Sequence, residues 1–211
     1  MRFLWDIIKK FLIIFIGSSV LAVVMYRYVP VYVTPLMVIR AVEQKQADKP
    51  IKLKHKWLSL DKISHNMVQA VVASEDNLFM EHNGFDFDQI EKAIKEAKSG
   101  KRNRGASTIS QQTAKNVFLW NGRSYLRKGL EVWYTFLIET FWSKERIMEV
   151  YLNVIEYGDG IYGIEAASQH YFNRSAKKLT KHQSALIAAA LPNPLKRNPA
   201  HPTKYLNRRA N

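Results

Sequence analysis

The chain has 211 residues, of which 47% are hydrophobic and 24% are charged. This balance excludes a disordered chain and suits one domain of about 150 to 200 residues with an appendage. The absence of cysteine excludes a disulfide framework and a thiolate metal site. The formal charge of +14 favours an anionic partner, whether nucleic acid, acidic lipid headgroups or a phosphorylated substrate.

The first predicted element is an apolar helix close to the N-terminus. The run from Phe11 to Tyr26 is uncharged and mostly apolar, with Lys9 and Lys10 before it and Arg27 after it. A helix of this length rises about 24 Å, and snorkelling of the flanking basic side chains closes the gap to the ~30 Å hydrocarbon core. We therefore expect an uncleaved membrane anchor. A signal peptide and a buried core helix are the alternatives, but no small-x-small cleavage site follows the run.

The charges around this run predict its orientation. Arg2, Lys9 and Lys10 precede it, so the positive-inside rule places the N-terminus in the cytoplasm and everything after Arg27 on the outer face. Most of the positive charge lies in that exported part, where it suits an anionic bilayer or a bound pyrophosphate and where DNA is rarely met. We expect three parts: a tail and anchor over 1–27, a connector over 28–57 and a domain over 58–211.

The expected connector is interrupted by Pro30, Pro35 and Pro50. Proline disfavours helix at the residue before it, which is why this segment is interpreted as a connector. Its apolar stretch from Tyr28 to Ile39 is too short to cross a membrane again. We expect that stretch to lie in the membrane interface or to pack on the main domain.

From about residue 58 the hydrophobic periodicity predicts a mainly α-helical domain, and strand signals are weak. A domain built in this way buries one apolar stripe of each helix. Stripes at helical spacing occur in three stretches: Val68 to Val72, Leu126 to Phe141, and Ile147 to Val154.

Capping patterns predict two further helices. Asp88 with Glu91 resembles an N-cap box ahead of a short helix that ends near Gly100. Thr180 with Gln183 is a capping box that opens a helix up to the next proline.

An acidic pair directly follows the first apolar stripe. Glu75 and Asp76 stand at the C-terminal edge of that helix, with Phe79, His82 and Gly84 shortly after them. A carboxylate against an apolar wall has its pKa raised towards neutrality, where a general base works best. Taken alone, such a pair is more often a solvated surface pair, and a lone histidine is more often structural.

A second polar run extends from Gly105 to Asn116. Within it, Thr108, Gln112 and Lys115 stand at i, i+4 and i+7, so a helix would project them in one direction. A hydroxyl, an amide and an ammonium group together suit sugar hydroxyls and phosphate oxygens. The alternative is the solvated side of an amphipathic helix.

A third polar run is Arg127-Lys128-Gly129-Leu130-Glu131. For a lone Arg127 and Glu131 at i and i+4, a surface salt bridge would be the ordinary interpretation. Arginine binds phosphate in a bidentate manner and lysine binds it as a point charge, and both occur here.

These runs resemble the motifs of the peptidoglycan glycosyltransferases, glycosyltransferase family 51. The family commonly has two glycines before Ser-Thr of the second motif, where this chain has Gly105-Ala106, a minor departure. Five motifs appear in family order and cover about Val71 to Pro199. They are Glu75 to Gly84, Gly105 to Asn116, Arg127 to Glu131, Lys144 to Asn153 with Gly158 to Phe172, and Ala188 to Pro194.

The resemblance implies a lysozyme-like α fold and polymerisation of lipid II into glycan strands. It implies that Glu75 and Glu131 are catalytic, Glu75 being the base that takes the proton from the 4-hydroxyl of lipid II. The implied substrate-binding and pyrophosphate-binding residues are Ser107, Thr108, Gln112, Lys115, Asn116, Arg123, Arg127 and Lys128. The implied site-shaping residues are Asp76, Phe79, His82 and Gly84. No cofactor is obligatory, and a divalent cation, magnesium or manganese, held by Glu131 or Asp76 is left open.

Two other classes of protein are the alternatives. A lytic transglycosylase or lysozyme-type hydrolase would also be helical, basic and exported, but its leaving group is a sugar, so it would lack the cation set of the second and third motifs. A non-catalytic membrane scaffold would account for the anchor but not for two acidic motifs. Two Ser-x-x-Lys matches lack the partner motifs of a transpeptidase, which favours a monofunctional enzyme.

The expected location is the bacterial inner membrane, crossed once. The expected partners are lipid II, the growing lipid-linked strand and the membrane, with other cell-wall synthesis proteins left open and nucleic acid excluded.

Overall fold

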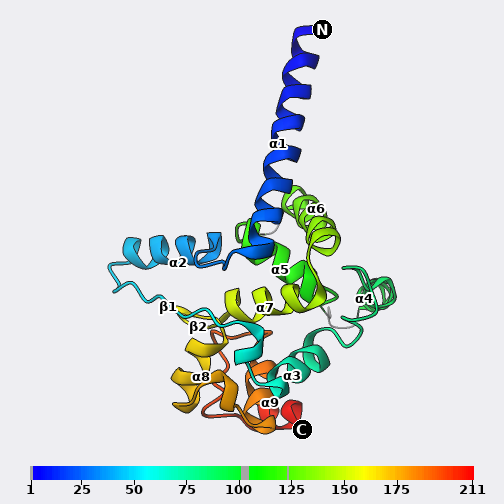
Figure 1. The fold of residues 1–211 in the computed structure, drawn as a ribbon. Coiled ribbons are helices and arrows are strands. Elements are labelled where there is room, and N and C mark those ends of the chain that lie inside the picture. Colours follow the sequence, from blue (N-terminus) through cyan, green and yellow to red (C-terminus); the bar gives the residue numbers. More distant parts are fainter. Residues whose placement is uncertain (1, 101–104, 123) are drawn as a thin grey trace.

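The structure is a computed structural model that describes residues 2–100, 105–122 and 124–211, and Figure 1 shows the arrangement of its elements. Helices dominate, which confirms the predicted mainly α-helical fold with one N-terminal apolar helix. The described helices are α1 (Arg2–Tyr28), α2 (Pro35–Gln46), α3 (His65–Glu75), α4 (Phe87–Lys98), α5 (Ile109–Phe118), α6 (Tyr125–Phe141), α7 (Lys144–Val154), α8 (Ile164–Phe172), α9 (Lys181–Ala190) and α10 (Lys204–Ala210). Short 3-10 turns cover Leu60–Lys62 and Ala176–Lys178.

Three strands of two or three residues form one small sheet in the order β1-β3-β2. They are β1 (Lys54–His55), β2 (Glu156–Gly158) and β3 (Ile161–Tyr162). β3 pairs in parallel with β1 and antiparallel with β2. The sheet joins the segment before α3 to the turn after α7, a long-range pairing between strands too short to leave an alternating pattern in the sequence.

The main core forms where α3, α5, α6, α7 and α9 meet, with α7 at its centre (Figure 1). α3 packs on α9, and α5 packs on both α6 and α7. Ile147, Val150, Tyr151 and Val154 are each fully buried, as the apolar stripe predicted. Burying one such aliphatic side chain contributes about 1.5 to 3 kcal/mol, so α7 fixes the neighbouring helices that carry polar side chains.

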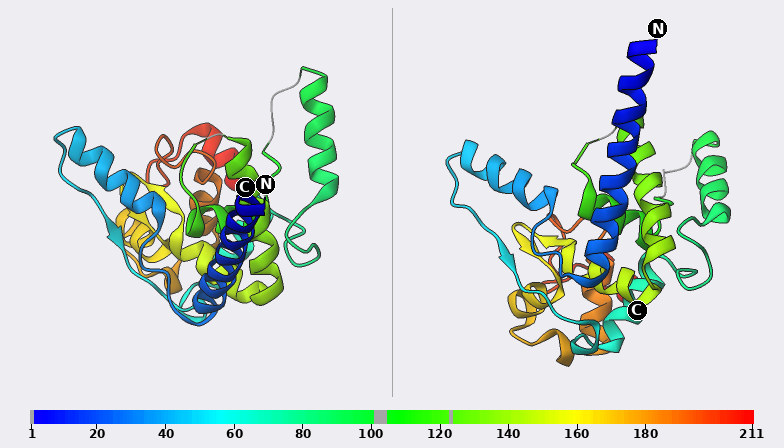
Figure 2. Two further views of the ribbon diagram at one scale, coloured as in Figure 1. Left: turned by 90° about the horizontal axis from the view of Figure 1, so that it is seen from above. Right: turned by 45° about the horizontal axis from the view of Figure 1, so that its top comes forward.

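α1 is both an apolar rod and a part of the domain. Its 27 residues have a mean hydropathy of 2.2 in their most apolar window, so the helix is long and apolar enough to cross a membrane. The N-terminal half projects beyond the body of the molecule, whereas the C-terminal half lies along α6 (Figures 1 and 2). There Ser19 and Val23 are buried, Trp133 Nε1 donates to Ser19 Oγ at 3.1 Å, and Trp142 Nε1 donates to the Val23 carbonyl at 2.8 Å.

The last turn of α1 is capped by a side chain of α7. Arg146 Nη2 donates to the carbonyl oxygens of Tyr26 at 2.8 Å and Val29 at 2.7 Å. The final carbonyls of a helix have no intrahelical partner and carry partial negative charge, so a guanidinium satisfies them and complements the helix dipole. The C-terminal end of the apolar helix is therefore held by the domain itself.

The segment expected to be a connector contains α2, a helix of 12 residues. Pro35 stands in its first turn, and Thr34 caps it by accepting a hydrogen bond from Met37 N at 3.3 Å. Proline is favoured at the first helical position because its fixed φ suits the helix and its missing N–H would be unpaired there anyway. Pro35 therefore begins a helix, and Leu36 and Met37 pack against Tyr162.

The N-cap of α4 differs from the prediction by two residues. Asp86, and not Asp88, caps the helix, because Asp86 Oδ1 accepts a hydrogen bond from Gln89 N at 2.8 Å. Asp88 stands in the first turn, where its charge complements the helix dipole. The predicted capping box of Thr180 and Gln183 is confirmed at the start of α9.

We predict that the two halves of α1 contribute differently to stability. Deleting residues 2–14 leaves the contacts of Ser19, Val23 and Tyr26 intact. Deleting residues 2–27 removes them, and leaves the N–H groups of Trp133 and Trp142 without their partners at about 1 to 3 kcal/mol each. The longer deletion should therefore melt at least about 5 °C below the shorter one, measured by circular dichroism in one detergent. Equal melting temperatures would show that this packing contributes nothing to the fold.

Candidate active site

Glu75 is the last residue of α3 and is half-buried. Burial raises the pKa of its carboxyl group above the usual range of a glutamate. Hydrogen bonds oppose this shift in part: Gln112 Nε2 donates to Oε2 at 3.2 Å, and Ser74 Oγ donates to Oε1 at 3.4 Å. Glu75 is therefore a stronger proton acceptor than an exposed glutamate. The hydrogen bond from Gln112, in the second motif, sets the orientation of its carboxylate.

Buried tyrosines lie near this carboxylate. Tyr151 of α7 donates its hydroxyl to Gln112 Oε1 at 3.4 Å. Burial raises the pKa of Tyr151 and of Tyr157 well above the usual value, and the charge of Glu75 adds to the shift. Both phenols therefore stay protonated. The sequence placed Tyr151 within a packed helix of the fourth motif, and its contact with Gln112 comes from the packing of α5 on α7.

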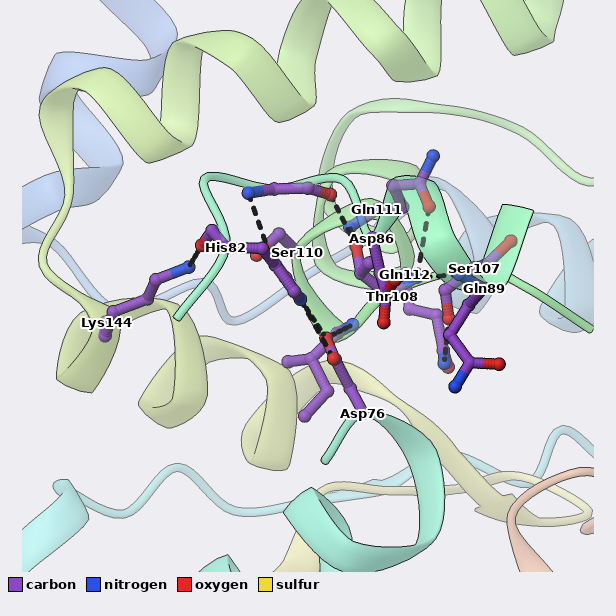
Figure 3. A network of polar contacts seen from close by, with 12 residues as sticks. Asp76, His82, Asp86, Gln89, Ser107, Thr108, Ser110, Gln111, Gln112 and Lys144 are labelled. Carbon is purple, nitrogen blue, oxygen red and sulfur yellow. Dashed lines mark hydrogen bonds and ion pairs between the residues drawn. The ribbon is translucent and has the colours of Figure 1, made fainter. Parts of the chain in front are cut away.

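Asp76 is buried and fastens the first motif to the start of α5. His82 Nε2 contacts Asp76 Oδ1 at 2.9 Å, and the Ile109 N–H donates to Oδ2 at 2.9 Å (Figure 3). Gly84 N donates to His82 Nδ1 at 3.1 Å, so the ring proton is on Nε2 and is donated to Asp76. All of these groups are engaged inside the protein, which fits the site-shaping role predicted for Asp76 and His82.

Gly84 has a positive φ of 89° in a crowded position. A Cβ at this residue would lie 2.8 Å from Thr135 Cγ2 and 2.9 Å from Glu139 Cγ, so only glycine fits both the conformation and the space. Phe79, also of the first motif, is 1% exposed and belongs to the main core. Gly84 permits the tight backbone of the loop after α3, and Phe79 anchors that loop in the core; their site-shaping role stays a prediction.

Thr108 does not share an exposed face with Gln112 and Lys115. It is the N-cap of α5, where its hydroxyl accepts from Gln111 N at 3.1 Å and donates to the Gly84 carbonyl at 2.7 Å (Figure 3). This buried hydroxyl is fully used by the protein, because it caps one helix and holds a neighbouring loop. Ser107 is exposed, and Asn116 is 8% exposed within α5.

The third motif forms a group of charges around a buried carboxylate at the start of α6. Glu131 is 3% exposed. Its Oε2 pairs with Arg127 Nη1 at 2.8 Å, and its Oε1 pairs with Lys128 Nζ at 2.5 Å. Both carboxylate oxygens of Glu131, which the resemblance implied to be catalytic, are thus committed to cations. Arg123 was also predicted to bind pyrophosphate, and it lies outside the described residues.

Among the described cations of this region, Lys115 has an ammonium group that is available to bind an anion. Within residues 2–100, 105–122 and 124–211, its Nζ has neither a hydrogen bond nor an ion pair. Burial lowers its pKa; the charge of Glu131 opposes this shift, and those of Arg127 and Lys128 add to it. An ammonium group that is partly desolvated and has no anion attached is a natural receptor for a phosphate oxygen.

These side chains form one continuous polar row, comprising Glu75, Gln112, Lys115, Glu131, Arg127 and Lys128. Gln112 binds Glu75, Lys115 follows one turn along α5 on the same side, and Glu131 interacts electrostatically with Lys115. The row has a proton acceptor at one end and three cations at the other. Such an arrangement can remove a proton from a hydroxyl and stabilise a departing anion in the same reaction.

Among the described residues, the polar row offers no set of ligands for a divalent cation. In the part of the chain that the structure describes, no three His, Asp or Glu side chains gather as a metal site would need. The oxygens of Asp76 accept hydrogen bonds from His82 and Ile109, and those of Glu131 are paired with bases. The magnesium or manganese ion left open by the resemblance stays a prediction, and no chemical step below depends on it.

The sequence has close similarity to known proteins over almost its whole length. Residues 43–211 match the family model described as Transglycosylase. The biosynthetic peptidoglycan transglycosylase of Bacteroides thetaiotaomicron is 62% identical over 202 residues, which are 95% of this chain and 81% of that protein. Its counterpart in Caulobacter vibrioides is 55% identical over 208 residues, 99% of this chain and 88% of that protein.

A third relative, the biosynthetic peptidoglycan transglycosylase of Bdellovibrio bacteriovorus, is 53% identical over 210 residues, covering 98% of this chain and 84% of that protein. The matched region contains every described member of the polar row. The hydrolytic and non-catalytic alternatives have no support from these relatives, which are all biosynthetic transglycosylases. The chain therefore belongs to the transglycosylase family, the peptidoglycan glycosyltransferases that polymerise glycan chains.

Proposed function

We propose that the protein elongates glycan strands from lipid II by inverting glycosyl transfer. The growing lipid-linked strand is the donor, and Glu75 takes the proton from the 4-hydroxyl of an incoming lipid II. That oxygen bonds to the donor anomeric carbon as the bond from this carbon to pyrophosphate breaks. The α linkage becomes β, and undecaprenyl pyrophosphate departs with the bonding electron pair.

The observation that carries this proposal is the hydrogen bond that joins a half-buried carboxylate to a helix bearing an unpaired ammonium group. A general base works best when its pKa is near the operating pH, and burial moves Glu75 in that direction. Pyrophosphate is already a good leaving group, so the reaction needs cations at the departing oxygens and does not need a strong acid.

Lys115, Arg127 and Lys128 supply those cations in this mechanism. Lys115 contacts a pyrophosphate oxygen directly, since its ammonium group has no other anion among the described residues. Glu131 holds Arg127 and Lys128 in place through two ion pairs, so it acts through them and not on the sugar. Arginine adds a bidentate contact that a lysine point charge cannot make.

The membrane is the surface on which this chemistry takes place. We propose that α1 crosses the bacterial inner membrane once with its N-terminus in the cytoplasm. Its 27 residues are about 40 Å long, more than the ~30 Å core requires, so its C-terminal turns can pack on the domain. Tyr28 at its end and Tyr32 and Val33 just after it are each at least 60% exposed, which suits a segment at the interface, where the pyrophosphate of lipid II lies.

We predict that Glu75→Gln lowers polymerisation at least about 100-fold with its folding unchanged, because the amide keeps the shape and loses the basicity. In the wild type, the acid limb of kcat/KM should lie above the usual pKa of a glutamate, with activity lost as pH falls through the raised pKa of Glu75. Polymer from fluorescent lipid II, separated on gels from pH 4 to 9, measures both effects. A folded Glu75→Gln protein with wild-type rates would remove Glu75 from the mechanism.

The cations give a second prediction. Lys115→Ala or Arg127→Ala should each cost about 2 to 4 kcal/mol in the transition state, which is about a 30- to 1,000-fold loss of kcat/KM. Lys95→Ala on the exposed side of α4 is the matched control and should keep the wild-type rate. The assay is run at low salt so that surface charges do not mask the loss. Full activity in either variant would show that the replaced side chain faces solvent and does not stabilise the leaving pyrophosphate.

The role of the apolar helix is tested by deleting residues 2–14, which leaves its packed half in place. Tethering raises the effective concentration of the enzyme at the plane of the substrate. The deletion should therefore lower polymerisation more in liposomes than with detergent-solubilised lipid II, by at least about tenfold. Equal activity in liposomes would mean that the anchor takes no part in substrate capture.

A further inference from the structure

Glu139 of α6 and Lys144 of α7 meet behind the first motif, outside the polar row. Lys144 Nζ donates to the His82 carbonyl at 2.6 Å (Figure 3) and to Glu139 Oε1 at 2.8 Å. The same ammonium group lies 4.7 Å from the centroid of the Phe79 ring. Glu139 Oε1 also accepts a hydrogen bond from Ser110 Oγ of α5.

These contacts form a closed ring. Ser110 is the neighbour of Ile109, whose N–H donates to Asp76 Oδ2 at 2.9 Å. Asp76 in turn accepts from the His82 ring, and the His82 carbonyl returns to Lys144. The ring therefore links the loop after α3 to α5, α6 and α7, and each contact between these segments is a hydrogen bond or an ion pair.

The ring is shielded from water. The side chain of Lys144 is 17% exposed, that of Glu139 is 9% exposed, and that of Asp76 is 2% exposed. Polar contacts in such surroundings are stronger and more directional than on the surface, and removing one partner leaves another buried and unpaired. The loop that carries Phe79 and His82 is thus held by charge as well as by packing.

The ring also determines where the catalytic carboxylate stands. Asp76 follows Glu75 directly, so fixing Asp76 on the first turn of α5 fixes the end of α3 from which Glu75 projects. Gln112, which binds Glu75 at 3.2 Å, belongs to the same helix α5. A shift of about 1 Å between a base and its substrate can cost about 100-fold in rate, so a small loosening of this ring has a large effect.

We propose that Glu139 and Lys144 are positioning residues for Glu75, which rests on the proposed function of Glu75 as the base. They act by holding the His82–Asp76 segment on α5. Neither contacts the substrate in this mechanism. Both side chains are largely shielded from water, and their charges are paired with each other.

The first test measures the variants Lys144→Met and Glu139→Gln. The matched controls are Lys95→Met and Glu91→Gln, which change an exposed 2.5 Å ion pair of α4 in the same way. In the ring variants, kcat should fall at least tenfold while KM for lipid II stays within about twofold, because the polar row is intact. The control variants should match the wild type. Wild-type kcat in Lys144→Met would overturn the proposal.

Lys144→Arg supplies a rescue that separates charge from bulk. Lys144 lines an open groove of about 570 Å³ beside Val72 and Met148, so a longer basic side chain has room. This variant should keep at least half of the wild-type kcat. In addition, the Glu139→Gln and Lys144→Met double variant should lose no more than the worse single variant. Failure of the rescue together with additive losses would show two independent structural contributions.

A measurement without substrate distinguishes this proposal from the proposed function. Amide hydrogen exchange at Ile109 and Gly84 should be at least tenfold faster in Lys144→Met, while the amides of α7 keep their protection. Unchanged exchange at both amides would overturn the proposal that the ring holds the His82–Asp76 segment on α5. If wild-type protein does not polymerise lipid II, the proposed function fails, and the exchange result still decides whether the ring holds the loop.

Discussion

The buried carboxylate of Asp76 connects the two halves of the active site, because it binds the His82 ring of its own loop and the first free N–H of α5. The start of a helix offers unpaired N–H groups and a positive partial charge, so an anion there is stabilised. Glu75 precedes this anion, and α5 carries the amide and ammonium groups that Glu75 works beside. The distance from Glu75 to the cations of α5 is therefore fixed in part by this contact, together with the hydrogen bonds of Thr108 to Gly84 and of Gln112 to Glu75.

The polar row keeps a base and three cations close together without letting them neutralise each other. Gln112 is the residue that separates them: its neutral amide binds Glu75, and Lys115 stands one turn farther along α5. A lysine in direct contact would lower the pKa of Glu75 and occupy the ammonium group that the leaving pyrophosphate needs. At the other end of the row, the buried carboxylate of Glu131 is paired with the largely buried Arg127 and the exposed Lys128.

The packing of α1 gives the membrane-facing part of the molecule a fixed relation to this row. Two tryptophans and Arg146 bind the C-terminal half of α1, and Val23 belongs to the main core. α1 lies on α6, the helix that also carries Glu131. A rod held in this way sets the height and tilt of the domain, whereas a flexible tether would leave both free. In the proposed function, this packing presents the row to membrane-bound substrates in one orientation.

By itself, the sequence showed the family motifs through their resemblance, and it determined the features that depend on neighbours three or four residues apart: the stripes of α6 and α7 and the capping box of α9. These follow from helix geometry and need no knowledge of the rest of the chain. Only the tertiary structure decided which polar side chains are used in contacts within the protein. Thr108 became a cap, Glu131 became the partner of two cations, and Asp86 replaced Asp88 at the start of α4. Glu139 and Lys144 meet the loop of the first motif because the packing of α6 and α7 brings them against a segment some sixty residues earlier, and burial by distant segments leaves no local pattern in a sequence.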